Sequence, residues 1–124
     1  MEINDPRTYS LIGAAMEVHA ILGHGFLERV YHDSLAVEMR LRSIPYVSKP
    51  KLEIYYKDEL LSCSYVPDFV GYESVVVEIK AISCLTTNDR AQLINSLKIS
   101  RRRVGLLINF GEPRLAWHRF DLDS

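Results

Sequence analysis

The sequence predicts a mixed α+β (α/β) domain in which helices flank a mixed β-sheet, with the element order α-α-β-β-β-β-α-β-β. Apolar residues recur at helical spacing early in the chain and in one later segment, whereas short β-branched or alternating runs fill most of the rest. Of the 124 residues, 48% are apolar and 25% are charged, a balance typical of a globular protein with a real core. We therefore expect one domain over residues 1–124.

Two helices are expected at the start of the chain. Asp5 can act as the N-cap of the first, Pro6 suits its first position, and Gly23 can end it in the left-handed conformation. The second should run from about Phe26 to Ser43. The predicted apolar stripes are Tyr9, Ile12, Met16 and Ala20 in the first helix, and Leu27, Val30, Val37 and Leu41, widened by Tyr31 and Leu35, in the second.

Strand patterns occupy most of the remaining chain. They cover residues 51–56, 60–66, 69–70, 75–82, 104–110 and 115–120, and all are expected to join one sheet. A helix over about 89–100 should connect the fourth of these strands to the fifth. A connection of this kind links parallel neighbours by a right-handed crossover, so strands 75–82 and 104–110 should be parallel.

Composition excludes some classes of protein and leaves others open. No apolar run is long enough to span a membrane, the N-terminus does not resemble a signal peptide, and Cys63 and Cys84 lack zinc or CxxC spacing. These features favour a cytoplasmic protein with reduced thiols. The net charge is −1, yet residues 90–119 hold seven basic residues and one acid, a local excess of 7 − 1 = 6. Charge alone does not distinguish a polyanion-binding face from a solvated surface.

Three charged residues interrupt or adjoin the most strand-like segment. Alternate side chains of a strand share a face, so Glu78 and Lys80 point away from Ile79. If residues 71–74 form a hairpin turn, Asp68 on the preceding segment lies beside Glu78. Neighbouring carboxylates repel unless a proton or a cation intervenes, and a hard divalent cation with a lysine beside it suits phosphodiester hydrolysis. A lone E-x-K pattern is usually a surface ion pair, but Asp68 at hairpin distance favours a site.

These residues also carry a resemblance to a known family. Pro67-Asp68, nine intervening residues and then Glu78-Ile79-Lys80 resemble the signature of the PD-(D/E)XK nuclease superfamily. Residues 13–19, 22–31, 92–95 and 104–111 resemble the small prokaryotic GxxExxR proteins, a branch of that superfamily. The resemblance covers nearly the whole chain. It implies a restriction-endonuclease-like core. It also implies a nuclease that depends on Mg²⁺ or Mn²⁺ and acts on nucleic acid, and we expect DNA rather than RNA as its substrate.

The resemblance also assigns roles to particular positions. Asp68, Glu78 and the Ile79 carbonyl match metal ligands, and Glu28 matches a helix-borne acid that completes such a site. Lys80 matches the residue that positions or activates water. Gln92 matches a glutamine that faces the site from the next helix. Two positions depart from the pattern: Ser96 stands where an aromatic residue is usual, and Tyr31 stands where the family motif ends in arginine.

Further residues have a weaker link to nucleic acid. His24 lies between two glycines shortly before Glu28, so it is either a phosphate contact or a plain loop residue, whereas His19 fits a core histidine. The basic residues expected to touch backbone phosphates without reading sequence are Lys98, Arg101, Arg102 and Arg103. A homodimer or a protein partner could supply target selection. The competing interpretation is a nucleic-acid-binding or assembly module on a nuclease fold, active only with a partner or not at all.

Overall fold

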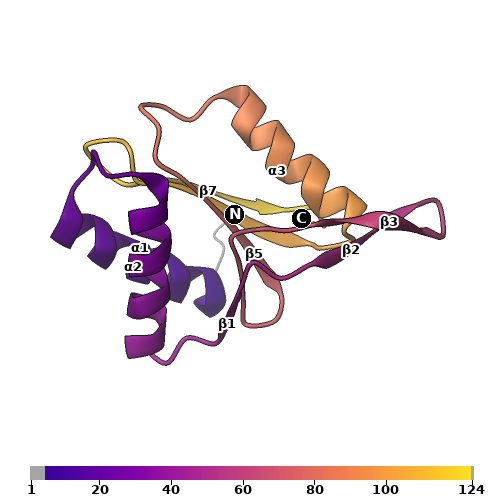
Figure 1. Ribbon diagram of the computed structural model, residues 1–124, viewed down its shortest axis with the longest axis horizontal. Helices are drawn as coiled ribbons and strands as arrows, with labels where there is room; N and C mark the ends of the chain where they lie inside the picture. Colours follow the sequence, from indigo (N-terminus) through magenta and orange to yellow (C-terminus); the bar gives the residue numbers. More distant parts are fainter. Residues whose placement is uncertain (1–4, 124) are drawn as a thin grey trace.

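Five strands form one mixed sheet, and two further strands form a separate hairpin (Figure 1). The computed structural model describes residues 5–123. Neighbouring strands of the large sheet follow the order β1-β4-β5-β6-β7, so β5 is central. In chain order the elements are α1 (Pro6–Leu22), α2 (Glu28–Leu41), β1 (Tyr46–Ser48), β2 (Leu52–Tyr56), β3 (Glu59–Tyr65), β4 (Phe69–Gly71), β5 (Val75–Lys80), α3 (Thr87–Ile99), β6 (Val104–Asn109) and β7 (Ala116–Asp121).

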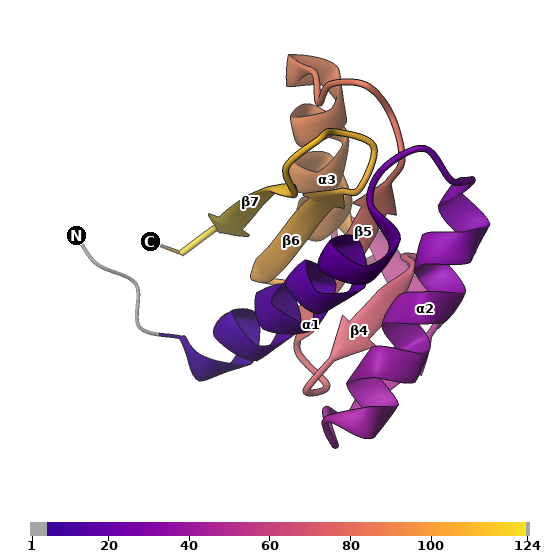
Figure 2. The same cartoon turned by 90° about the vertical axis from the view of Figure 1, so that its left-hand side faces the viewer.

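The five-stranded sheet is covered on both faces. Figure 2 shows α1 and α2 on one side of β5 and β6 and α3 on the other. Val77 of β5 belongs to the buried cluster that contains Leu11 and Leu35 of the first two helices. Its neighbour Val76 points the other way and joins the cluster that contains Leu97 of α3. Burial on both faces explains why β5 and β6 are almost continuously apolar.

The parallel pair β5–β6 is confirmed. The register runs from Val75 opposite Val104 to Lys80 opposite Asn109, and α3 lies between the two strands in sequence. Every residue of β6 is buried. Parallel strands bring their carboxyl ends to the same edge of the sheet, so the charged end of β5 lies where the chain leaves for α3.

The ends of α1 also agree with the sequence. Asp5 Oδ1 accepts a hydrogen bond from Arg7 N at 3.0 Å, and Pro6 is the first helical residue. Gly23 has φ 71° and donates its N–H to the His19 carbonyl. No helix within residues 5–123 is long and apolar enough to cross a membrane.

The predicted apolar stripes of both N-terminal helices are wrong in most of their members, although Tyr31 and Leu35, which were expected to widen the second stripe, are buried. Tyr9 is 82% exposed and Leu27 is 79% exposed, although each had been expected to face the core. The small side chains of α1 let it pack closely on its neighbours, and the largest side chains of α2 fill the space over the sheet. The buried residues are Thr8, Leu11, Ala14, Ala15 and Val18 in α1, and Tyr31, Leu35 and Met39 in α2.

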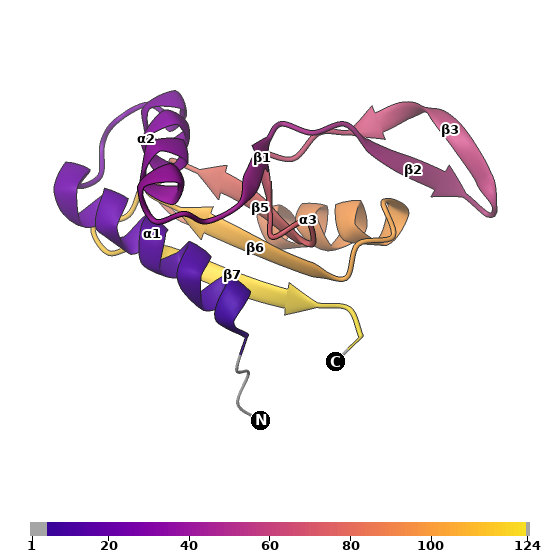
Figure 3. The same cartoon turned by 90° about the horizontal axis from the view of Figure 1, so that it is seen from below.

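The sheet differs from the prediction at one edge. The short strand β1, which was not predicted, pairs with β4 from Tyr46 opposite Gly71 to Ser48 opposite Phe69. Because β1 occupies that edge of β4, the predicted hairpin of β2 and β3 cannot continue the large sheet. It forms its own two-stranded sheet and projects from the body (Figure 3). All of β3 is exposed except Tyr65, which is partly buried.

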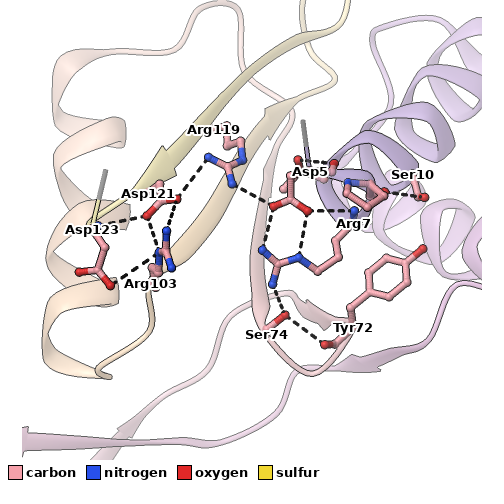
Figure 4. A network of polar contacts seen from close by, with 11 residues as sticks. Asp5, Arg7, Ser10, Tyr72, Ser74, Arg103, Arg119, Asp121 and Asp123 are labelled. Atoms are coloured by element: carbon pink, nitrogen blue, oxygen red, sulfur yellow. Dashed lines mark hydrogen bonds and ion pairs between the residues drawn. The ribbon is translucent and has the colours of Figure 1, made fainter. Parts of the chain in front are cut away.

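An ion-pair network joins the two ends of the described chain (Figure 4). Asp5 Oδ2 contacts Arg7 Nη2 at 2.8 Å and Arg119 Nη2 of β7 at 2.9 Å. Hydrogen bonds from the Arg7 side chain, followed by those from Arg119, lower the pKa of Asp5 against the opposing effect of burial. Arg103 Nε contacts Asp121 Oδ1 at 2.7 Å. The network holds the start of α1 against the last strand.

Candidate active site

A polar cavity of about 460 Å³ opens beside the carboxyl half of β5. Its walls come from the start of α2, the segment before β4, strands β5 and β6, and one side of α3 from Asp89 to Ser96. The lining residues are Glu28, Asp68, Glu78, Ile79, Lys80, Asp89, Gln92, Leu93, Asn95, Ser96 and Leu107. The structure thus places all five side chains predicted to be catalytic around one cavity.

Asp68 and Glu78 lie against each other where the pairing of β4 with β5 ends. The last pair in that direction is Phe69 opposite Val77, so the next residues, Asp68 and Glu78, are neighbours. Asp68 Oδ2 accepts a hydrogen bond from Ile79 N at 2.8 Å, and Glu78 Oε1 accepts one from Asp68 N at 3.2 Å. The hydrogen bonds fix both carboxyl groups relative to the backbone of the central strand.

The carbonyl group of Ile79 is directed toward the same place. In a strand, the N–H and C=O of one residue point to the same side. The N–H of Ile79 points to Asp68, whereas the carbonyl of Lys80 points to the β6 side and accepts a hydrogen bond from Phe110 N at 2.8 Å. Three oxygen-bearing groups therefore converge at the end of β4: two carboxyl groups and one carbonyl.

Tyr65, the last residue of β3, completes the contacts of Glu78. Its hydroxyl group donates a hydrogen bond to Glu78 Oε2 at 2.5 Å. The pKa of Glu78 is raised to about 7, mainly by burial; the hydrogen bond from Tyr65 opposes this shift, and the adjacent Asp68 carboxyl group adds to it. Burial, followed by the bond to Glu78, raises the pKa of Tyr65 as well, so its hydroxyl group keeps its proton. The sequence analysis missed Tyr65, whose only signal is its place three residues before Asp68.

Glu28, Lys80 and Gln92 line the cavity from three different elements. Partial burial raises the pKa of Glu28, the nearby Asp68 raises it further, and Lys80 opposes this shift. Gln92 lies one turn into α3, on the side that faces β5. Hydrogen bonds from Thr86 lower the pKa of Asp89, and the charge of Lys80 lowers it further. The ammonium group of Lys80 thus acts on an acid of α2 and on an acid of α3.

Two further residues that sequence reasoning missed contact the site. The ring of His32 stacks on Phe69 with centroids 4.2 Å apart, and its Nε2 lies 3.4 Å from the Asp68 carbonyl oxygen. It follows Glu28 by four residues, so a helix-face argument from Glu28 could have found it. Ser96, where an aromatic residue had been expected, instead lies close enough to Tyr65 to lower the pKa of its hydroxyl group. An aromatic side chain therefore reaches this position from β3 rather than from α3.

Other predicted residues lie outside the cavity. His24 is exposed in the loop between α1 and α2 and is not part of the lining. His19 places Nε2 at 2.9 Å from the Glu112 carbonyl oxygen, as expected for a structural histidine. The basic stretch follows the far end of α3, at the opposite end of the parallel strands from Lys80.

Three of the four basic residues of that stretch make contacts within the chain. The guanidinium of Arg101 lies 4.2 Å from the ring centre of Tyr55. Arg102 donates to the Glu73 carbonyl at 3.3 Å, and Arg103 pairs with Asp121. Lys98 is exposed. The geometry therefore gives these arginines structural contacts, and their role toward phosphates stays a prediction.

The donor groups at the cavity suit a hard divalent cation. Within residues 5–123, no group of three or more His, Cys, Asp or Glu residues is close enough to hold a metal ion. The pair of carboxyl groups with the directed Ile79 carbonyl nevertheless supplies the oxygen atoms that Mg²⁺ prefers, and such an ion usually keeps several waters.

Comparisons with known proteins agree with this arrangement. A family model described as the PD-(D/E)XK nuclease superfamily matches residues 5–120. Among solved structures, one titled "Crystal structure of SSO0001" is similar, with a TM-score of 0.59, 15% sequence identity, and coverage of 97% of this chain and 69% of that chain. At that identity the similarity concerns the fold alone. No curated protein sequence matches the chain.

Proposed function

The chain belongs to the PD-(D/E)XK nuclease superfamily, and we propose that it is a metal-dependent nuclease that hydrolyses phosphodiester bonds of DNA without strong sequence readout. One observation carries the proposal: Asp68, just before β4, and Glu78, on the central strand β5, are held together by hydrogen bonds to the backbone and line a cavity that Lys80 also lines. Members of the superfamily generally are nucleases and usually use divalent metals. We also assign the chain to the GxxExxR branch, on the motifs described above.

Asp68, Glu78 and the Ile79 carbonyl would hold the cation, either Mg²⁺ or Mn²⁺, and Glu28, which lines the same cavity, would contribute to its site. A divalent cation at this position supplies positive charge that offsets the negative charge of the transition state. The buried location of Glu78 strengthens this interaction, because electrostatic effects grow as water is excluded. Tyr65 and the Asp68 N–H hold the Glu78 carboxyl group in a fixed orientation.

Lys80 and Gln92 act on the substrate. During hydrolysis a water oxygen bonds to phosphorus, the bond from phosphorus to one sugar oxygen breaks, and negative charge develops on the phosphate oxygens. The ammonium group of Lys80 stabilises that charge and orients the water, because Lys80 lines the same cavity as Asp68 and Glu78. Gln92 faces the same space from α3 and hydrogen-bonds to the bound strand.

Weak sequence selection follows from the absence of a suitable reading element among the described residues. The inner side of α3 lines the cavity and packs into the core through Leu93 and Leu97, so it is not free to contact bases. We expect the structure or the ends of the nucleic acid to govern its choice.

The first experiment is a cleavage assay on linear, circular, single-stranded and branched DNA and on RNA. Wild type is tested with Mg²⁺, with Mn²⁺ and with a chelator, beside Glu78→Gln and the exposed control Glu17→Gln. We expect cation-dependent cutting of DNA that Glu78→Gln removes and Glu17→Gln retains. Binding of nucleic acid without cutting on every substrate would contradict the proposal and favour the alternative, a binding or assembly module on a nuclease fold.

A further inference from the structure

The outer face of α2 carries an apolar stripe that the described residues leave open. Its members follow one another at alternating intervals of three and four residues. The exposed fractions of its apolar side chains are 79% for Leu27, 37% for Val30, 47% for Val37 and 65% for Leu41. We call this set, together with the partly buried Ser34 between them, the α2 stripe: Leu27, Val30, Ser34, Val37 and Leu41.

The spacing of the α2 stripe is that of a helix-pairing surface. An average interval of 3.5 residues keeps side chains along one seam between two packed helices. The domain does not need this surface for its own core, because α2 faces the core through Tyr31, Leu35 and Met39. A row of exposed apolar side chains at this period therefore calls for a second helix.

We propose that a second copy of this chain covers the α2 stripe, so that the protein forms a homodimer through antiparallel packing of the two α2 helices. In this arrangement Val30 meets Leu41 of the partner subunit, and Ser34 meets Val37 of the partner subunit. Each contact occurs twice about the two-fold axis, as required for an isologous interface. The axis passes near the middle of α2, so Val30, Val37 and Leu41 of both copies lie within the contact, and Leu27 lies at its margin.

Charged residues beside the α2 stripe select this partner and this direction. Asp33 and Arg40 lie on the same flank of the stripe, seven residues or about two helical turns apart, and both are exposed. When the helices run antiparallel, Asp33 faces Arg40 of the partner subunit, and the pairing occurs twice. When they run parallel, Asp33 instead faces Glu38 of the partner subunit, which is repulsive. The stripe is thus complementary to itself only in the antiparallel arrangement.

The proposed contact is small, and this sets the expected affinity. α2 contains 14 residues, and at 1.5 Å per residue it is about 21 Å long. A seam of this length lies below the usual area of a stable interface, so we expect a dissociation constant of about micromolar order. The inference does not depend on the proposed nuclease activity.

The test is the mass in solution, measured by sedimentation equilibrium over a wide concentration range around the micromolar scale. Wild type is compared with Asp33→Arg, with Arg40→Asp and with the double variant. Each single change puts like charges opposite each other twice, so we expect the dimer dissociation constant to rise by about tenfold or more. The double variant restores opposite charges and should recover wild-type association.

Two further variants separate the apolar seam from general surface effects. Leu41→Glu should abolish the dimer, whereas Met16→Glu, at a residue of α1 that is 55% exposed and outside the α2 stripe, should leave it unchanged. Circular dichroism confirms that each variant is folded. A wild type that stays monomeric at every concentration, or a double variant no better than the single variants, would overturn the inference. Because the readout is mass, loss of the dimer and loss of cleavage are distinguished.

Discussion

Glu78 combines a structural cost with its proposed role. It is a carboxyl group beside Asp68, and burial raises its pKa from 4.5 to about 7. A raised pKa in the folded state means that folding favours the protonated form. Its contribution to stability is complete below the unfolded pKa and is lost as pH rises from about 4.5 to about 7. Above that range, and without a cation, the carboxylate destabilises the fold.

This linkage predicts that Glu78→Gln stabilises the metal-free protein at pH 8. The amide keeps the shape and can still accept the bond from Tyr65, but it carries no buried charge. We expect the free energy of unfolding in urea with a chelator to rise by about 1–3 kcal/mol at pH 8 and to change little at pH 4. A variant that is less stable than wild type at pH 8 would show that the charge of Glu78 is already compensated within the chain.

The residues of the site differ in how far sequence could predict them. Asp68 and Glu78 were expected to meet because period-two alternation and one hairpin turn determine which side chains are neighbours. Tyr65 and His32 were missed because their contacts depend on where the hairpin and α2 lie relative to β5. Those positions follow from tertiary packing, which no local pattern contains.

The segment that follows β5 fixes the position of Lys80. Asn109 of β6 accepts a hydrogen bond from Ile82 N at 3.0 Å and donates one to the Ile82 carbonyl at 2.9 Å. Gly111 packs directly against this segment, and a Cβ atom there would collide with the backbone of Ile82 and Ala81. The hydrogen bonds of the Asn109 side chain and the close packing of Gly111 therefore fix the chain after Lys80.

Gly111→Ala should consequently be strongly destabilising. The collision involves backbone atoms, which cannot rotate away, so we expect a loss of about 2–4 kcal/mol in urea unfolding. Gly25→Ala is the matched control: it has a φ of 112° but no atom within 4 Å of the added carbon, so its cost is backbone strain alone. Equal stability of Gly111→Ala and wild type would mean that the segment that follows β5 is not tightly packed.

The sequence predicted where helices and strands form better than it predicted which face of each helix is buried. Caps and turn residues located α1, helical spacing of apolar residues located α3, and β-branched runs located the buried strands. The core face of α2 was mistaken because two apolar stripes coexist on one helix, and only contact with the sheet distinguishes Leu35 from Leu41. β1 was missed because three residues carry too little pattern for a strand.

For the whole molecule, two separate anchors hold the layers around the site. The Asp5–Arg119 contact ties α1 to the last strand, and the two hydrophobic clusters fix α2 and α3 on opposite faces of β5. Chain order and the parallel crossover were predictable, because local signals and connection rules determine them. The separate hairpin was not, since it depends on β1 taking the edge of β4.

The central claim is that the carboxyl pair and Lys80 form one hydrolytic site. Its most direct measurement is the cleavage rate on the best DNA substrate with saturating Mg²⁺, for wild type, Asp68→Asn and Lys80→Ala at equal concentrations of folded protein. We predict that both variants remain folded and that each falls below about one hundredth of the wild-type rate. Cleavage at the wild-type rate by either folded variant would contradict the claim.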